Sequence, residues 1–220
     1  VDHKSALQDL YNIMQQKSLS QSDLDIFLKK LDNEDAIKIR IYVKALLNYL
    51  EKNKIKFNFD DCSFGNILLA GAFIKNNQSF NLAIKEMAEF LNLKGKVMNI
   101  TNGENLFLSA LLRTGEFISS EADIVEKRAN DEIEEIFLSE RYLNEKEIRK
   151  VKKMKKEEKV KYLRNVEIYP KMSEESKSVI EDSDVLIYSA GTQNSSLFPT
   201  YLTEGFTETV IANKKAKKVF

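Results

Sequence analysis

The residues best suited to chemistry lie between positions 184 and 211, where the sequence reads DVLIYSAGTQNSSLFPTYLTEGFTETVI. An apolar run at 185–188 predicts a strand, and the apolar-periodic residues after 196 predict a helix. The loop between them, 189–196, contains one glycine, four hydroxyls and two amides. Because the N–H groups and the dipole at the start of such a helix favour an anion, we expect an anion site in this loop. Its candidate ligand-binding residues are Gly191, Thr192, Gln193, Asn194, Ser195 and Ser196.

Two further pairs of polar residues stand at the ends of expected elements. Ser63 and Asn66 lie at a loop-to-helix junction, and Thr101 and Asn102 end a short expected strand. In open α/β sheets, ligands bind at the carboxyl ends of the strands. Three polar groups that meet at that edge would form a cleft suited to phosphate and sugar hydroxyls. For each group taken alone, the simpler alternative is a solvated turn.

The sequence singles out no catalytic residue and no metal ligand. His3 is the only histidine, so neither a Ser-His-Asp arrangement nor a His-rich zinc site is available. Cys62 is the only cysteine, and we interpret it as a buried small side chain. The phosphate-binding patterns GxxxxGKS/T and GxGxxG are both absent from the sequence.

Composition excludes several classes of protein. The chain has 220 residues, of which 43% are hydrophobic and 31% are charged, as is typical of a folded globular protein. A formal net charge of zero does not favour a general nucleic-acid binder. One cysteine excludes an intramolecular disulfide framework and fits the reducing cytoplasm. Because no apolar run reaches about 18 residues, we expect no membrane partner and a cytoplasmic location.

Apolar spacing predicts helices over much of the N-terminal half. Residues 1–55 repeat apolar side chains every three to four positions, and 60–92 continue with a buried helix and an amphipathic one. The charge-rich segment 140–165 mixes both signs, which predicts a solvated helical insertion, with a basic face for a polyanion as the alternative. In the buried helix, small residues would allow close backbone approach at Gly65, Ala70, Gly71 and Ala72.

Short apolar runs after residue 96 predict the strands of a single α/β domain spanning 1–220. The expected strands are 97–101, 106–119, 132–139, 185–189 and 218–220, of which 106–119 is a hairpin that turns at Thr114 and Gly115. We expect the apolar run 185–188 to be buried within the sheet.

Four motifs, taken in order, resemble those of the 2-phospho-L-lactate transferases and their bacterial relatives, the gluconeogenesis factors (CofD/YvcK-like). They are DCSFGNILLAGAF, AIKEMAEFLNLKGKV, NITNGENLFLSALLRTGEFISSEADI and SDVLIYSAGTQNSSLFPTYL, and together they cover roughly residues 60–220. The resemblance implies a Rossmann-like three-layer α/β fold with a mainly parallel sheet. By position, it makes Asn66 and the loop 191–196 ligand-facing and Thr101 a weaker candidate.

Two functions follow from the resemblance. One is transfer of a phospho-ester group from a guanosine diphosphate carrier onto a deazaflavin, in which Mg²⁺ would neutralise the pyrophosphate. The other is non-catalytic binding of a UDP-sugar to regulate carbon flow into cell-wall precursors. In both, the partner is a nucleotide or a nucleotide-sugar. A module that binds nothing is the third alternative.

The sequence also departs from the family pattern. Cys62 stands where the family has histidine, Ala190 where it has proline, and Asn194 where it has tyrosine. No glycine precedes Gly65, so the glycine-rich first phosphate loop is missing from these residues. Its absence would leave strand edges unpaired. We therefore expect a homodimer through an open edge or further chain beyond these residues, with weak nucleotide binding and no turnover by the chain alone.

Overall fold

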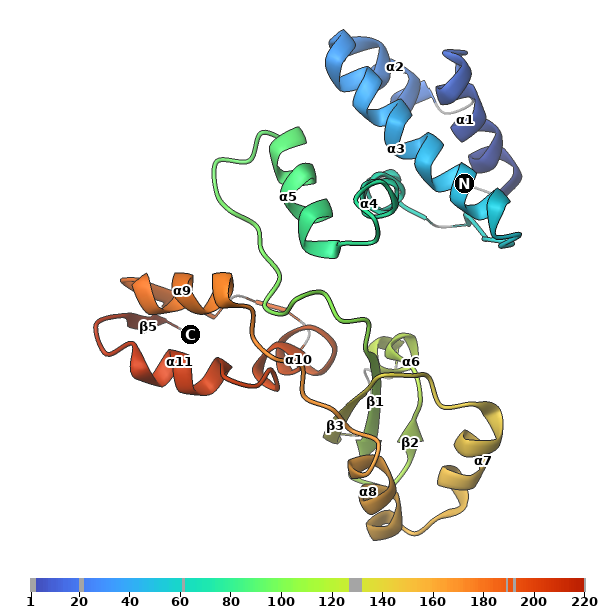
Figure 1. The fold of residues 1–220 in the computed structure, drawn as a ribbon. Helices are drawn as coiled ribbons and strands as arrows, with labels where there is room; N and C mark the ends of the chain where they lie inside the picture. Colours follow the sequence, from blue (N-terminus) through green and yellow to red (C-terminus); the bar gives the residue numbers. More distant parts are fainter. Residues whose placement is uncertain are drawn as a thin grey trace. The chain divides into compact units, whose positions relative to one another are not determined.

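The structure is a computed structural model that describes residues 3–19, 22–60, 62–126, 132–188, 190–191 and 193–219. The chain divides into two compact units, residues 1–98 and 99–220, and each is described here by itself (Figure 1). Whether the two units form the single domain expected from the sequence stays a prediction.

The N-terminal unit is helical throughout its described regular structure. Its elements are α1 (His3–Gln15), α2 (Ser22–Lys30), α3 (Asn33–Lys52), α4 (Phe64–Lys75) and α5 (Phe80–Phe90). The helical prediction for 1–55 is confirmed by the first three of these. Asp32 caps α3, because its side chain accepts a hydrogen bond from the Asp35 N–H at 2.8 Å.

The core of this unit lies where α3 packs against α4. Tyr42 and Val43 of α3 and Ala72 of α4 are almost completely buried. At Gly71, an added Cβ would stand 2.2 Å from the Tyr42 carbonyl oxygen, so the helices approach each other at a position that only glycine fits. The same prediction is wrong for Gly65, where an added Cβ would meet no atom within 4 Å.

The C-terminal unit contains a three-stranded antiparallel sheet in the order β2–β1–β3. It is built from β1 (Phe107–Leu112), β2 (Phe117–Ile118) and β3 (Ile133–Ser139). The hairpin expected at 106–119 and the strand expected at 132–139 are both confirmed. Gly115 takes φ +86 in the hairpin turn, a conformation in which a residue with a side chain is strained.

A second sheet consists of two parallel strands, β4 (Val185–Ile187) and β5 (Lys217–Val219). β4 forms where the apolar run predicts it, but its expected burial is wrong: Val185 is 51% exposed and Ile187 is 72% exposed. A two-stranded sheet has no central strand, so β4 pairs along one edge only.

Two predictions about the main sheet are also wrong. The α/β class is confirmed, but the mainly parallel, three-layer Rossmann arrangement is not seen among the described residues. A tight turn joins β1 to β2, and such turns connect antiparallel strands; β3 also pairs with β1 in the antiparallel sense. The segment 97–101 forms no strand, and only Thr101 makes an isolated antiparallel bridge, to Met172. Val97 in this segment is exposed, so no neighbouring layer buries it.

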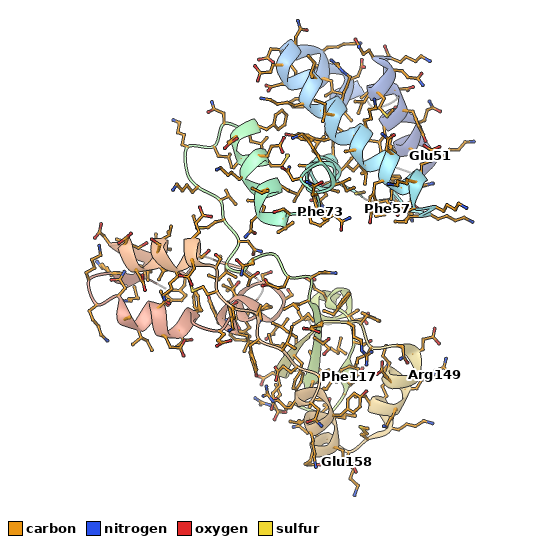
Figure 2. All side chains as sticks on the ribbon, viewed as in Figure 1. Glu51, Phe57, Phe73, Phe117, Arg149 and Glu158 are labelled. Atoms are coloured by element: carbon orange, nitrogen blue, oxygen red, sulfur yellow. The ribbon has the colours of Figure 1, made fainter. Side chains whose placement is uncertain are left out.

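The charge-rich segment is helical, as expected, and packs on the antiparallel sheet. It forms α7 (Glu145–Lys153) and α8 (Lys156–Arg164), whose buried Val151 and Leu163 join Phe117 of β2 in one core. Figure 2 shows Phe117 inside this layer, with Arg149 and Glu158 pointing outward. Apart from the buried Lys159, charges of both signs thus occupy the solvated faces while one apolar stripe is buried.

The remaining helices of this unit lie between its strands along the chain. They are α6 (Glu121–Glu126), α9 (Glu174–Asp182), α10 (Phe198–Tyr201) and α11 (Phe206–Ala212), and the π-helical turn η1 (Gln193–Leu197) leads directly into α10.

Candidate functional site

Backbone pairing between three distant segments builds the framework of the candidate site. The Ser173 N–H donates to the Ile100 carbonyl at 2.9 Å, which joins 99–101 to 170–173. On the other side of 170–173, the Glu204 N–H donates to the Pro170 carbonyl at 2.9 Å, and the Met172 N–H donates to the Glu204 carbonyl at 3.1 Å. The segment 170–173 therefore lies between the polar group at Thr101 and the chain that follows α10.

A cavity of about 240 Å³ opens beside this framework, and we call it the Thr101–Thr203 cavity. It brings Thr101 together with Ser195, two candidates from different motifs of the sequence. Its other lining residues are Asn99, Ile100, Glu104, Leu106, Leu108, Glu121, Leu138, Pro170, Pro199, Thr200 and Thr203.

The polar lining of the Thr101–Thr203 cavity consists of hydroxyls, one amide and two carboxylates. Among the described residues that line it, the charged ones are Glu104 and Glu121, and both are exposed. Negative charge here disfavours a bare phosphate and favours groups that donate hydrogen bonds. Leucine and proline side chains complete the wall with apolar surface.

Thr101 is held in place by local hydrogen bonds. Its Oγ1 accepts from Nδ2 of Asn99 at 3.3 Å and from the Gly103 N–H at 3.2 Å. The Asn99 carbonyl in turn accepts from the Ser176 hydroxyl at 2.8 Å, at the start of α9. The polar residues expected at a strand end therefore form an ordered turn at the edge of the cavity.

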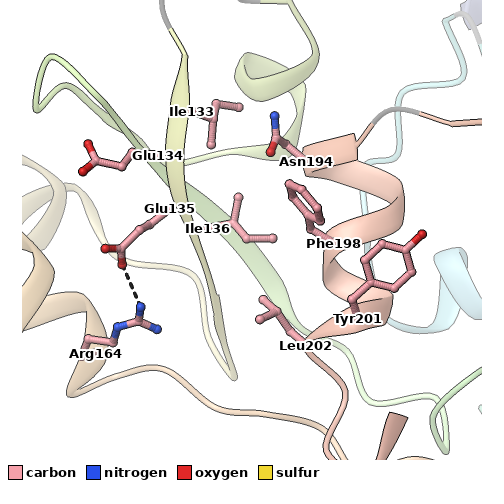
Figure 3. Close-up of a pocket in the computed structure, with 9 residues that line it drawn as sticks. All are labelled: Ile133, Glu134, Glu135, Ile136, Arg164, Asn194, Phe198, Tyr201 and Leu202. Carbon is pink, nitrogen blue, oxygen red and sulfur yellow. Dashed lines mark hydrogen bonds and ion pairs between the residues drawn. The ribbon is translucent and has the colours of Figure 1, made fainter. Parts of the chain in front are cut away.

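A second cavity, of about 260 Å³, lies on another face of the helical segment formed by η1 and α10, and we call it the Phe198 cavity (Figure 3). Asn194, Phe198 and Tyr201 line it from η1 and α10, opposite Ile136 of β3. Its wall also contains Ile133, Glu134, Glu135, Arg164 and Leu202.

Arg164 is the cation of the Phe198 cavity, and two carboxylates engage it. Its guanidinium lies 2.6 Å from Glu167 Oε2 and 2.8 Å from Glu135 Oε2, and the hydrogen bond to Glu167 is the main cause of its raised pKa. Two carboxylates of the chain itself therefore balance this exposed charge.

The chain belongs to the CofD family. Its sequence matches the family described as "2-phospho-L-lactate transferase CofD" over residues 9–220. No match to a curated protein was found.

Two crystal structures of protein BH3568 from Bacillus halodurans, a member of the UPF0052 family, are similar to this CofD family chain. One has a TM-score of 0.52 at 22% identity and covers 98% of this chain and 64% of that chain, which supports a shared fold. The other has a TM-score of 0.48 at 24% identity and covers 71% and 39%, respectively. The chain thus spans less than two thirds of the length of the solved protein.

The candidate residues of this CofD family chain fall into separate places. Asn194 lines the Phe198 cavity, whereas Ser195 lines the Thr101–Thr203 cavity. Ser63 belongs to the N-terminal unit, where its hydroxyl caps α4 by accepting from the Asn66 N–H at 3.2 Å. Thr192 lies outside the described residues, and the other candidates, Asn102, Gly191, Gln193 and Ser196, are exposed.

Sequence reasoning missed most of the cavity wall. Glu104 and Glu121 lie within one of the four motifs without being chosen as candidates, Thr203 directly follows the last motif, and Pro170 comes from a segment that the sequence left without a role. The described residues contain no group of three or more His, Cys, Asp or Glu side chains that could hold a metal ion. They also contain no helix that is both long and apolar enough to span a bilayer.

Proposed function

We propose that this chain binds a nucleotide-diphosphate-linked ligand at the segment that joins β4 to α10. The supporting observation is the Thr101–Thr203 cavity, in which Thr101 and Ser195 line one space although they come from different motifs. Family membership adds to this, because the family's description names a transferase that acts on a phosphorus-containing group.

The diphosphate is assigned to the start of η1 rather than to the cavity. Ser195 lies in η1 and also lines the cavity, so a ligand whose anionic part contacts the first turn places its next group at the cavity mouth. The dipole of the helix favours an anion at its first turn. Glu104 and Glu121 in the cavity repel one.

Binding without turnover is the function we propose first, and transfer of a phospho-ester group is the second candidate. Transfer requires the negative charge of the diphosphate to be neutralised, commonly by Mg²⁺. The described residues contain no group of three or more His, Cys, Asp or Glu side chains that could hold a metal ion by itself, so a Mg²⁺ here would also need phosphate oxygens of the ligand. We derive no step through a metal, and a Mg²⁺ requirement remains the measurement that separates the two candidates.

A charge introduced at Ser195 tests the binding site. In calorimetric titrations with UDP-sugars, UDP and GDP, Ser195→Asp should weaken binding at least a hundredfold. A like charge about 4 Å from a phosphate costs about 4 kcal/mol at an effective dielectric constant near 20. Asparagine has the same shape as aspartate without its charge, so Ser195→Asn should retain most of the affinity.

A second control, Ser178→Asp, places the same charge on the exposed surface of α9 and should leave binding unchanged. Equal affinities for Ser195→Asp and Ser195→Asn would locate the diphosphate elsewhere. No binding of any nucleotide by the unaltered chain would reject the proposed function. If turnover of the nucleotide appears only when Mg²⁺ is added, transfer replaces binding as the first candidate.

A further inference from the structure

Opposite charges are segregated onto two helices of the C-terminal unit. α7 carries five basic and two acidic side chains, a formal charge of +3. α9 carries four acidic side chains and one basic side chain, a formal charge of −3. The formal net charge of zero for the whole chain is therefore made up in part of two oppositely charged surfaces, and a net charge near zero favours association between molecules.

The outer face of α7 is basic along its whole length. Residues at i, i+3, i+4 and i+7 share one stripe of a helix, and here all four are exposed and basic: Lys146, Arg149, Lys150 and Lys153. Figure 2 shows Arg149 pointing outward, and its guanidinium pairs with Glu145 at 2.7 Å. The three lysines form no ion pair within the described part of the chain, and Lys150 Nζ lies 5.6 Å from the centre of the Tyr162 ring.

The outer face of α9 is acidic. Four exposed carboxylates lie on it: Glu174, Glu175, Glu181 and Asp182. Ser176, on the opposite side of the helix, is buried, and none of the four carboxylates forms an ion pair among the residues that the structure describes. They form two pairs seven residues apart, the same interval that separates Lys146 from Lys153. At 1.5 Å of rise per residue, both charged stripes are about 10 Å long and therefore match in length.

Several of these charges destabilise their own helix. The helix dipole favours acidic side chains in the first turn and basic ones in the last. Lys146 lies in the first turn of α7, and Glu181 and Asp182 lie in the last turn of α9, so each stands at the end that its charge disfavours. Lys146 and Lys150 are also four residues apart, a spacing at which like charges repel each other. A partner of opposite charge would remove these costs.

The surroundings of α7 favour a protein partner over a nucleic acid or a lipid surface. The three arginines between 141 and 164 already pair with carboxylates, so their guanidinium groups are engaged before any phosphate arrives. No large apolar side chain of α7 is exposed for insertion into a bilayer. The acidic complement that α7 requires is present on α9, and no ion pair joins the two helices within the described residues of one chain.

We propose that copies of this chain associate through these faces, with α7 of one copy against α9 of another. Lys146 meets one acidic pair of α9 and Lys153 meets the other. Exposed ion pairs are individually weak, so the association depends on protein concentration and is lost at high ionic strength. The residues that line the Thr101–Thr203 cavity lie outside both helices, so this contact does not depend on the proposed ligand.

Charge reversal on each helix tests the contact. Sedimentation velocity of the full chain at about 50 mM NaCl should show dimers or larger species, which dissociate at about 500 mM NaCl because the Debye length shortens. The α7 variant combines Lys146→Glu, Lys150→Glu and Lys153→Glu. The α9 variant combines Glu174→Lys, Glu175→Lys, Glu181→Lys and Asp182→Lys. Each variant alone should raise the dissociation constant of self-association by about tenfold or more, because attraction becomes repulsion.

Mixing the two variants separates this contact from a general effect of charge. The α7 variant and the α9 variant present opposite charges to each other at both faces, so their mixture should associate at low salt although neither variant does so alone. The matched control combines Lys85→Glu, Lys94→Glu and Lys96→Glu, which are exposed positions of the N-terminal unit. It changes the net charge by the same amount as the α7 variant and should leave self-association unchanged.

Circular dichroism verifies that each variant folds, and glutamine at the same positions is the second set of variants, which removes the charges and should also abolish association. Monomers of the unaltered chain at both salt concentrations would overturn the proposal. Association that survives reversal of either helix, or that the mixture fails to restore, would overturn it as well. If the unaltered chain stays monomeric but binds a single-stranded oligonucleotide that the α7 variant does not bind, the basic face belongs to a nucleic acid instead.

Discussion

Replacing Gly71 by alanine should separate α3 from α4 and destabilise the N-terminal unit. The added Cβ would stand 2.2 Å from the carbonyl oxygen, 2.5 Å from the carbonyl carbon and 2.8 Å from the Cα of Tyr42. Ordinary van der Waals contact begins at 3.4 Å, so the closest approach is roughly 1.2 Å too short. All three atoms belong to the backbone, and no change of rotamer relieves the clash.

Two opposing effects set the magnitude of this change. Alanine is a better helix former than glycine by about 1 kcal/mol in a helix interior. Overpacking a tight core typically costs about 1–3 kcal/mol, and a clash with immobile backbone belongs at the upper end. We therefore expect Gly71→Ala to lower the free energy of unfolding by about 2 kcal/mol.

Gly65→Ala is the matched control, because Gly65 lies in the same helix and its added Cβ would meet no atom within 4 Å. This variant should be neutral or more stable by up to about 1 kcal/mol. Urea unfolding followed by circular dichroism compares the two variants, and hydrogen exchange in peptides from α3 and α4 localises the change. If both variants unfold at the same urea concentration, the close approach of α3 and α4 at Gly71 is incorrect.

Two further predictions concern the C-terminal unit. The hydrogen bond from Arg141, followed by one from the Asn144 N–H, lowers the pKa of Glu147 to about 2, so its stabilising effect is present above pH 4.5 and is lost as the pH falls through about 2. An acid titration that follows the helical signal of α7 should show this loss of stability, and Glu147→Gln should remove the loss. The same titration curve in the variant and the unaltered chain would contradict this role of Glu147. The buried Lys159 (7% exposed) donates from Nζ to the Gly115 carbonyl at 2.6 Å. Lys159→Met should therefore reduce the free energy of unfolding by about 1.5–3 kcal/mol, measured by urea unfolding, and an unaltered midpoint would refute the bond.

Local pattern was enough to place many elements. Apolar spacing predicted the helices at 3–52 and both strands of the β1–β2 hairpin, and Gly115 marked its turn. These signals work because the periodicity of a helix or strand and the φ requirement of a turn are properties of neighbouring residues. The order of four motifs also identified the family.

Sequence pattern was less informative about what each element packs against. The apolar run at 185–188 forms its strand, yet Ile187 is largely exposed. An apolar run predicts a strand but does not specify which layers cover it. Likewise, Gly65 and Gly71 look equivalent in the sequence, and only the second lies against the backbone of Tyr42.

The sequence by itself determined the helices, the hairpin and the family of this protein, and the tertiary structure alone decided the make-up of its candidate site. The pairing of 170–173 with both 99–101 and Glu204 joins segments far apart in the chain, and no local signal specifies it. That pairing brings Thr101, Ser195 and Thr203 to one cavity. Periodicity reports how a residue stands relative to its neighbours in sequence, whereas a site depends on non-local contacts that exist only after the chain has folded.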